Sequence, residues 1–524
     1  MDNHSTLQTL ILRGVLICLV VAGLCGCANL LPDRGPVRQE HALAGFEDTT
    51  LYRATASELN DPKACGLRPL PVASYALAAR LELARRAERT LDVQYYVFRD
   101  DKSGLMLMRA LRDAAQRGVR VRVIIDDLHT VGEDTVLSDL NAEPNVEVRL
   151  YNPVASWRRT SLGRNLGALP EIQRLNHRMH NKLFVADNAA AIFGGRNLSD
   201  EYFMRSDESN FVDLDMFVAG SPVRDLSSAF DTFWNSSIVF PLVRVLGPHL
   251  PADQARAEFD RLTRDIPIPA PEKLPEQYVR FTTLPAEIAE GHVGYLVPAQ
   301  CSVVADAPTK FEKVDDPGFP TVMRTVLNML AGAQKEAEIV SPYFVPGEYG
   351  MRMIHDGNLR GGHTLVITNS LASTDSPAAQ YGYMRYRKAM LKENVVLREL
   401  SPLLTTTRRR LGIFGNSLGR LHAKAVLVDR QRLFLGSMNL DFRSAYRNTE
   451  IGLIIDSPVL VEQLSALVDE ESFYELRLNS SDDIEWTQRL EDGTTQIFDV
   501  DPETTWWDRW WPMILGPLVP EKEL

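Results

Sequence analysis

The residues of this chain best suited to chemistry lie in two segments with the same internal spacing. In each segment a Lys follows a His by two positions, an Asp follows the Lys by five, and a glycine follows the Asp by seven. An Asn three positions after that glycine closes the segment. The two sets are His180, Lys182, Asp187 and Asn197, and His422, Lys424, Asp429 and Asn439. Two copies that begin 242 residues apart indicate a duplicated functional unit.

Each segment predicts a strand that presents its His and Lys together. The runs 183–185 and 425–428 are apolar and partly β-branched. Residues two apart on a strand share a face, so the His and Lys of each copy point the same way. Asp187 and Asp429 lie an odd number of positions from the Lys. That spacing favours a structural role for them, with direct participation in the chemistry as the alternative. The glycines allow a tight turn that returns the Asn to the Lys.

Two such units facing one another would surround one cavity with two His, two Lys and two Asn, a set that suits a phosphodiester. One imidazole attacks phosphorus and the other protonates the leaving alcohol. The ammonium and amide groups hold the non-bridging oxygens as negative charge builds. We therefore interpret both His and both Lys as catalytic, and Asn197 and Asn439 as phosphate-binding. Because the Lys side chains neutralise the charge, the chemistry requires no metal ion, and we expect no cofactor.

The duplicated His-x-Lys-x4-Asp pattern followed by Gly-Gly/Ser-x-Asn resembles the signature of the phospholipase D superfamily. The Leu91–Tyr96 segment, the Gly-Gly-Arg-Asn form of the first copy and the Asp213-Leu-Asp215 segment resemble bacterial cardiolipin synthases, in particular the type without paired N-terminal membrane helices. The resemblance covers nearly the whole chain after residue 45. It implies that Asp187 and Asp429 belong to the catalytic motif.

One acid follows each copy near the start of a predicted strand. Asp213 lies 33 residues after His180, and Glu450 lies 28 residues after His422. A carboxylate on the far imidazole nitrogen fixes the tautomer and stabilises the imidazolium. The family resemblance places a His-orienting acid here. We assign this role to Asp213, in preference to Asp215 on the same face, and to Glu450, which we expect beside His422. An ordinary ion pair is the alternative.

Predicted helices and strands alternate along the chain, which indicates α/β layers. A helix at 73–88 precedes strand 91–98, a helix near 104–116 and strand 119–125. The plan returns 243 residues later, where 360–362 matches 117–119 ahead of a strand. We therefore expect two homologous phospholipase D-like α/β sandwich halves with one active site at their interface. The expected boundaries are 46–265 for the first half, 266–289 for a proline-rich linker and 290–524 for the second half.

The N-terminus has the pattern of a targeting segment. Arg13 precedes an apolar run, 14–28, that is too short to span a bilayer comfortably but suits a signal-peptide core. The run ends Leu24-Cys25-Gly26-Cys27, which resembles a bacterial lipoprotein cleavage box. That resemblance implies a signal peptide at 1–26, lipidation of Cys27 and a tether at 27–45. We expect an exported, membrane-anchored lipoprotein, on the periplasmic face of the outer membrane in a Gram-negative cell. An ordinary signal peptide is the alternative.

Several other features bear on partners. The net charge of −12 argues against a general nucleic-acid binder. Arginine-rich segments precede both motifs, including Arg158, Arg164 and Arg178 before the first and 408–410 before the second. They suit anionic lipid headgroups, with solvated loops as the alternative.

Cys65 and Cys301, the remaining cysteines, either pair or stay free. Four of the seven Trp lie in 506–511. They either contact a membrane interface or belong to a tail that packs on the rest of the protein.

These observations favour a phosphatidyltransferase that makes cardiolipin from two phospholipids through a covalent phosphatidyl-histidine. The expected substrates are phospholipids, phosphatidylglycerol foremost and phosphatidylethanolamine as a further candidate. A hydrolytic phospholipase D that releases phosphatidic acid is the first alternative. A nuclease or other phosphodiesterase and a non-catalytic lipid-binding protein are less favoured. Binding alone would not need two His, and no nucleic-acid partner is expected.

The cleavage box makes a testable prediction. We expect Cys27→Ser to block lipidation, and therefore to shift the protein out of the membrane fraction or to stop its processing. Fractionation and gel migration of the variant against the parent protein measure this. A variant that fractionates and migrates like the parent would contradict the lipoprotein interpretation.

Overall fold

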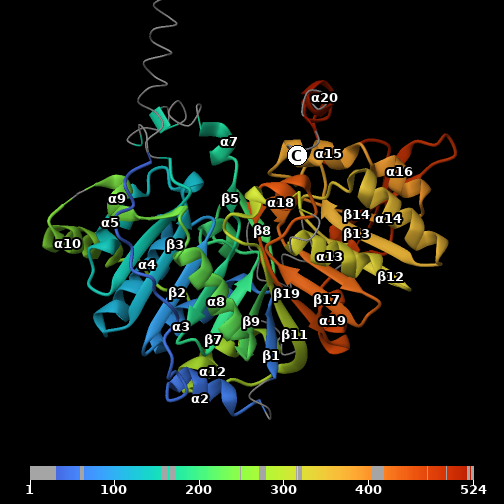
Figure 1. Ribbon diagram of the computed structural model, residues 1–524. Coiled ribbons are helices and arrows are strands. Elements are labelled where there is room, and N and C mark those ends of the chain that lie inside the picture. Colours follow the sequence, from blue (N-terminus) through green and yellow to red (C-terminus); the bar gives the residue numbers. More distant parts are fainter. Residues whose placement is uncertain are drawn as a thin grey trace, which may run out of the picture.

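The chain forms two α/β halves that lie side by side (Figure 1). The computed structural model describes residues 31–524 except 60–63, 155–157, 159–162, 165–170, 248–249, 271–278, 314, 317–320, 404–417, 469, 491, 516–519 and 521–524. The predicted signal peptide, Cys27 and the arginines at 408–410 therefore lie outside the described residues.

The sheet of the first half has three parallel strands with antiparallel strands on both sides of them. Its order is β10-β4-β3-β2-β6-β7-β9-β1, with β2, β3 and β4 parallel. The strands are β1 (Cys65–Leu70), β2 (Thr90–Tyr95), β3 (Arg120–Asp126), β4 (Val146–Tyr151), β6 (Leu183–Ala186), β7 (Ala190–Gly194), β9 (Asp215–Gly220) and β10 (Val239–Pro241).

Helices cover both faces of this sheet. They are α2 (Thr50–Ala56), α3 (Ala73–Arg86), α4 (Lys102–Gln116), α5 (Asp134–Asn141), α7 (Ile172–Leu175), α8 (Pro222–Trp234), α9 (Leu242–Leu246), α10 (Ala252–Thr263), α11 (Val279–Thr282) and α12 (Leu284–Glu290), with short 3₁₀ turns η1 (Asp127–His129) and η3 (Asp200–Phe203). Helix α4 shows why the local sequence folds this way. The Asp101 side chain caps it by accepting from the N–H of Gly104, and Leu107, Met108 and Leu111 bury its apolar face.

The second half repeats the plan and extends it by two strands, β21 and β22. The order is β22-β21-β20-β14-β13-β12-β16-β17-β19-β11, with β12, β13 and β14 parallel. The strands are β11 (Val297–Ala305), β12 (Glu336–Val340), β13 (His363–Asn369), β14 (Val396–Leu400), β16 (Ala425–Val428), β17 (Arg432–Gly436), β19 (Ile451–Asp456), β20 (Phe473–Leu478), β21 (Ile484–Arg489) and β22 (Thr495–Phe498). The helices are α13 (Val322–Ala331), α14 (Gly347–Leu359), α15 (Pro377–Met384), α16 (Arg387–Lys392), α18 (Phe442–Tyr446), α19 (Pro458–Ser465) and α20 (Trp506–Leu515), with 3₁₀ turns η5 (Lys310–Glu312) and η6 (Glu470–Ser472).

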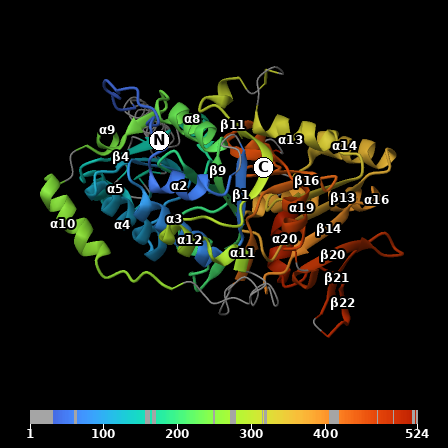
Figure 2. The ribbon, with the colours of Figure 1, turned by 90° about the horizontal axis from the view of Figure 1, so that it is seen from below.

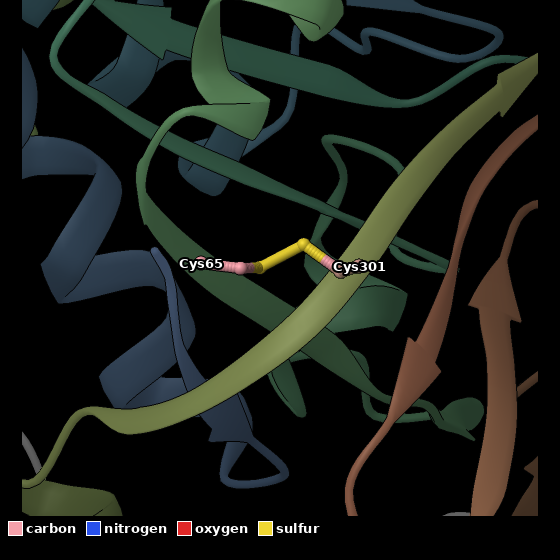
Figure 3. The surroundings of a disulfide bond; sticks show 2 residues. All are labelled: Cys65 and Cys301. Carbon is pink, nitrogen blue, oxygen red and sulfur yellow. A yellow bond between two sulfur atoms is a disulfide. The ribbon is translucent and has the colours of Figure 1, made fainter. Parts of the chain in front are cut away.

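The halves are joined through their edge strands. Strand β1 pairs antiparallel with β11, and Cys65 and Cys301 form a disulfide there, with their Cα atoms 6.2 Å apart (Figure 3). Seen from below, β1 lies between the two halves (Figure 2). One hydrophobic core packs α8 of the first half and α19 of the second against both sheets, and a separate core fills the outer side of each half. The open question about the two cysteines is thus resolved in favour of pairing.

Two short parallel sheets make a second junction. Strand β5 (Arg178–Met179) of the first half pairs with β18 (Asn448–Thr449) of the second. Strand β8 (Ser209–Val212) of the first half pairs with β15 (Leu418–Leu421) of the second. The two junctions are related by the same duplication as the halves, and each leads directly into one of the two His of the motifs.

The α/β halves and most of the predicted elements are confirmed, and two details differ. Asp213, expected near the start of a strand, instead lies between two strands, because β8 ends at Val212 and β9 begins at Asp215. Part of the expected linker is folded: α11 and α12 lie within 266–290, and Leu284 and Ile288 join the outer core of the first half. In the described part of the chain, we find no helix with the length and apolar character needed to cross a membrane.

The disulfide closes a loop of 236 residues, so its removal should destabilise the folded protein. Loop-closure entropy predicts a loss of about 2–5 kcal/mol in the free energy of unfolding. We expect Cys65→Ala with Cys301→Ala to lower the Tm, and a reducing agent to lower the Tm of the parent protein but not of this variant. Equal sensitivity of both proteins to the reducing agent would contradict the assignment.

Candidate active site

A β-hairpin carries each copy of the motif. His180 and Lys182 immediately precede β6, and His422 and Lys424 immediately precede β16. All four side chains are buried, with exposed fractions of 6% or less. Lys182 Nζ donates to the backbone oxygen of His180 at 2.7 Å, and Lys424 Nζ donates to that of His422. The predicted placement of each Lys beside its own His is therefore present in both halves.

Asp187 and Asp429 lie at the other end of these hairpins. Both residues have positive φ, 52° and 54°, in the tight turns after β6 and β16. The carboxylate of Asp187 accepts from the backbone N–H groups of 88–90, which lead into β2, and Asp429 accepts from those of 334–336, which lead into β12. Each Asp thus ties its hairpin to the neighbouring strand. These contacts support the structural alternative, and a direct role of the two residues in the chemistry stays a prediction.

Each His is hydrogen-bonded to an acid from the other half. His180 Nδ1 lies 3.0 Å from Glu450 Oε2, and His422 Nδ1 lies 2.7 Å from Asp213 Oδ2. An ionised carboxylate only accepts, so Nδ1 donates to it and Nε2 of each ring is left for chemistry. Lys424 Nζ also lies 2.8 Å from His422 Nδ1. The two predicted acids are correct, but the expected pairing of Glu450 with His422 was wrong.

The two short junction sheets produce this exchange. The backbone N–H of His180 donates to the oxygen of Thr449, directly before Glu450, at 3.0 Å. The N–H of His422 donates to the oxygen of Val212, directly before Asp213, at 2.8 Å. The backbone register between the halves therefore sets which acid meets which imidazole. Asp215, the acid that we did not choose, instead lies with Arg80 and Arg196 in the core.

Burial and mutual charge set the protonation states. Burial lowers the pKa of His180 and of His422 to about 4, against the opposing pull of their carboxylates. Burial would raise the pKa of Asp213, but His422 and Lys424 outweigh it and hold the value at about 2. The charge of Lys424 lowers the pKa of His180, and the charge of Lys182 lowers the pKa of His422. The side chains of the two motifs therefore lie close enough to interact electrostatically. Both imidazoles are therefore neutral near pH 7.

The lysines are pre-arranged for an anion. Burial and the proximity of Lys424 lower the pKa of Lys182 well below its usual value. Burial lowers the pKa of Lys424 to about 8, although Asp213 and Glu450 oppose this. Two neighbouring buried ammonium groups repel each other, and a bound phosphodiester would relieve that repulsion. The site is thus electrostatically complementary to a negatively charged ligand.

The two asparagines lie buried beside the motifs. Asn197 Oδ1 accepts from the N–H of Val97 at 3.2 Å, and the Asn197 side chain also hydrogen-bonds Tyr202. Asn439 is 3% exposed, and its Oδ1 has no hydrogen-bond partner among the described residues. Because the oxygen and the NH₂ of an amide exchange places by rotation, Asn439 can present a donor to a phosphate oxygen there.

Several residues at the site were not singled out by sequence reasoning. The rings of Tyr96 and Tyr202 lie edge-on to His180 and His422 at centroid distances of 5.1 and 5.0 Å, and Phe211 also contacts His422. These rings pack against the two imidazoles. Ser437 donates to Glu450 at 2.5 Å and fixes the acid in its place. The only sequence signal for Tyr96 was its position at the end of the family-like Leu91–Tyr96 segment.

The residue after the first glycine of each motif lies against the His-orienting acid. A side chain on Gly195 would overlap the Asp213 carboxylate, so only glycine fits there. The equivalent residue of the second half is Ser437, whose hydroxyl bonds the longer Glu450 side chain. The difference between Gly-Gly and Gly-Ser therefore follows from which acid passes beside the turn.

The arginines before the first motif are engaged in ion pairs. Arg158 and Arg164 pair with the buried Asp127, and Arg178 pairs with the buried Asp126. These ion pairs tie the three arginines to Asp126 at the end of β3 and to Asp127 of η1. Their predicted role as free contacts for lipid headgroups was wrong. The arginines at 408–410 lie outside the described residues, and their role stays a prediction.

Comparison with known proteins agrees with this geometry. The family model "Cardiolipin synthase, PLD-like domain" matches residues 81–234 and 326–471. The chain belongs to this phospholipase D-like family. Cardiolipin synthase C of Escherichia coli (strain K12) is 36% identical over 464 residues, which cover 86% of this chain and 94% of that protein. An uncharacterized protein of Helicobacter pylori (strain ATCC 700392 / 26695) is 32% identical over 74% of this chain and 76% of its own length.

A solved structure shows the same fold. Phosphatidylserine synthase from Haemophilus influenzae Rd KW20 superimposes with a TM-score of 0.51 at 16% identity, and the match covers 90% of this chain and 96% of that one. The duplicated phospholipase D-like architecture that the motifs predicted is thus confirmed.

The exchanged acids make a testable prediction. We expect Asp213→Asn and Glu450→Gln each to lower kcat roughly 10²–10⁴-fold, because the affected imidazole loses its tautomer control and its counter-charge. Steady-state kinetics with a phosphodiester substrate measure this.

Asp429→Asn is the matched control for these two variants. It weakens only backbone contacts on the hairpin turn, so it should lower the Tm and leave kcat of the folded enzyme within about twofold. A larger fall in kcat for this control than for Asp213→Asn would contradict the assignment.

Proposed function

We propose that this protein is a phospholipase D-type phosphatidyltransferase that makes cardiolipin from two phospholipids through a phosphatidyl-histidine. One observation carries the proposal: two buried imidazoles, each hydrogen-bonded at Nδ1 to a carboxylate, lie within electrostatic reach of two buried lysines. Such a site provides a nucleophile, a proton donor and charge neutralisation. Family membership and the 36% identity to Escherichia coli cardiolipin synthase C support the phosphatidyl chemistry.

The reaction proceeds in two balanced steps. In the first, Nε2 of His180 forms a bond to phosphorus, the bond to the leaving alcohol breaks, and that oxygen takes a proton from Nε2 of His422. In the second, the hydroxyl of an acceptor phospholipid gives its proton to His422 and attacks phosphorus, and the bond to His180 breaks. His422 ends as it began. The site itself is nearly symmetric and does not assign the two roles. The family resemblance supports His180 as the nucleophile and His422 as the proton donor.

The protonation states fit when substrate is bound. Both imidazoles are neutral before a substrate binds, so His180 is ready to attack. The phosphodiester brings a negative charge, which raises the pKa of the neighbouring imidazoles. Asp213 stays ionised and stabilises the imidazolium form of His422. A substrate anion thus helps to charge the acid that it needs.

Membrane attachment is part of the proposal. Lipidation of Cys27 would hold the enzyme on a bilayer. In α20, which stands above α15 in Figure 1, Trp506, Trp507 and Trp510 are 56%, 61% and 39% exposed. Exposed Trp side chains favour the interface of a membrane. The disulfide between the halves suits an exported protein. These features support the anchored, periplasmic placement expected from the sequence.

Lipid analysis of cells that make the protein tests the activity. Cells with the parent protein should gain cardiolipin, and cells with His180→Ala should not. Phosphatidic acid without cardiolipin would support the hydrolytic alternative. No lipid change with a folded parent protein would contradict both.

The division of labour between the imidazoles gives a further prediction. Acid assistance matters mainly for a poor leaving group, so His422→Ala should lose activity on phospholipid but keep some on a nitrophenyl phosphodiester and trap a phosphoenzyme on His180. His180→Ala should be inactive on both substrates and trap nothing. Mass spectrometry of acid-quenched protein decides. An adduct on His422 would reverse the assignment, and no adduct on either would contradict the covalent mechanism.

A further inference from the structure

A large apolar cavity lies in the second half, away from the two imidazoles. Its volume is about 620 Å³, in the range of ligand pockets. It runs between α13 and α14 and over β12 to α18. Its walls are mainly apolar side chains, among them Leu327, Leu330, Phe344, Met353, Ile354 and Phe442. The charged side chains of Glu348, Arg352 and Arg360 are solvent-exposed and stand at its rim. We call this cavity the α13–α14 groove.

The first half shows that the fold does not require this groove. Phe98 bridges to Leu198 in the first half as Phe344 bridges to Leu440 in the second, so the two halves correspond residue by residue here. In that correspondence α3 and α4 match α13 and α14. Helices α3 and α4 pack directly together in the outer core of the first half. The duplicated unit can therefore close this position with its own side chains.

Two small residues open the position in the second half. Leu111 of α4 corresponds to Gly357 of α14, and Phe203, five residues after Leu198, corresponds to Ala445, five after Leu440. Leu111 and Phe203 are 1% and 2% exposed and belong to the core of the first half, whereas Gly357 and Ala445 line the groove. An empty apolar space lined by Leu, Phe and Met lacks the packing that stabilises protein interiors. Among the described residues, Leu111 and Phe203 fill this position in the first half, whereas Gly357 and Ala445 leave it open in the second, and this difference indicates a ligand.

The groove shares one wall with the active site. Helix α18 begins three residues after Asn439, and its N-cap Asp441 lines the groove together with Phe442 and Ala445. Ser444 of the same helix faces the other way and donates to Glu450, the partner of His180, at 2.8 Å. From α18 the groove extends to Glu336 and His363, at the amino ends of β12 and β13. It therefore follows the length of β12, roughly 16 Å at the usual rise of a strand.

A long, narrow, apolar space that starts beside a phosphodiester site fits a hydrocarbon chain. We propose that the α13–α14 groove binds one fatty acyl chain of a substrate phospholipid and so sets a preference for long chains. This inference rests on the proposed function, because the phosphate of that lipid lies among the two His and two Lys. The binding free energy comes from apolar contact along the chain, which grows with chain length.

Restoring the residues of the first half tests the proposal. A Cβ on Gly357 would meet no atom nearer than Arg360 Nη2 at 4.0 Å, so the position accepts a side chain. We expect Gly357→Leu with Ala445→Phe to fill the groove and to raise the Tm, because a cavity is filled and a helical glycine is replaced. Activity on a sixteen-carbon phospholipid should fall about tenfold or more through KM, while activity on a six-carbon analogue should stay within about twofold. Asp356→Leu, on the exposed side of α14, is the matched control and should change neither activity.

A binding measurement separates this inference from the proposed function. A fluorescent long-chain fatty acid should bind the parent protein and the Asp356→Leu control, and a long-chain phospholipid should displace it. The double variant should bind it at least about tenfold more weakly. Equal binding by the double variant, or equal loss of activity on long and short substrates with an unchanged or raised Tm, would overturn the groove assignment. Groove-dependent binding in a protein that makes no cardiolipin would retain the acyl site and contradict the proposed function instead.

Discussion

The hydrogen bonds from each catalytic imidazole to a carboxylate of the opposite half are the constraint on which the rest of the structure depends. Neither half contains a complete catalytic pair, because His180 needs Glu450 and His422 needs Asp213. A small error in the docking of the halves would separate both pairs at once. The continuous sheet through β1 and β11, the disulfide and the shared core of α8 and α19 oppose such movement. The rigid junction is thus part of the catalytic apparatus.

The duplicated frame has diverged where its two copies meet different neighbours. Gly195 makes room for the short Asp213, whereas Ser437 bonds the longer Glu450. Leu111 and Phe203 close the outer core of the first half, whereas their counterparts leave an apolar groove in the second. These differences leave the positions of the motif residues unchanged. One backbone plan therefore provides two nearly symmetric motifs with surroundings that are asymmetric.

Spacing along the chain predicts the local geometry of the motifs but not their tertiary partners. The period-2 geometry of a strand places each Lys beside its own His, and the odd spacing of Asp187 and Asp429 points to their structural role. The sequence could not predict which acid contacts which His. The paired residues lie 270 positions apart for His180 and Glu450 and 209 positions apart for His422 and Asp213, and the register of two short sheets brings them together. The charge of the arginine-rich segment also suggested contacts with lipid headgroups that the structure does not leave free. Arg158 and Arg164 instead form buried ion pairs with Asp127, which lies more than thirty residues earlier. Tertiary partners of that kind leave no local pattern.

The most direct test of the exchanged pairs is nitrogen NMR of the protein labelled with ¹⁵N-histidine, in which the ring shifts of His180 and His422 report tautomer and proton position. We expect Asp213→Asn to change the Nδ1 signal of His422 and to leave that of His180 in place, and Glu450→Gln to do the reverse. The variants His180→Gln and His422→Gln identify the two signals. A change confined to the His of the same half as the substituted acid would contradict the crosswise site.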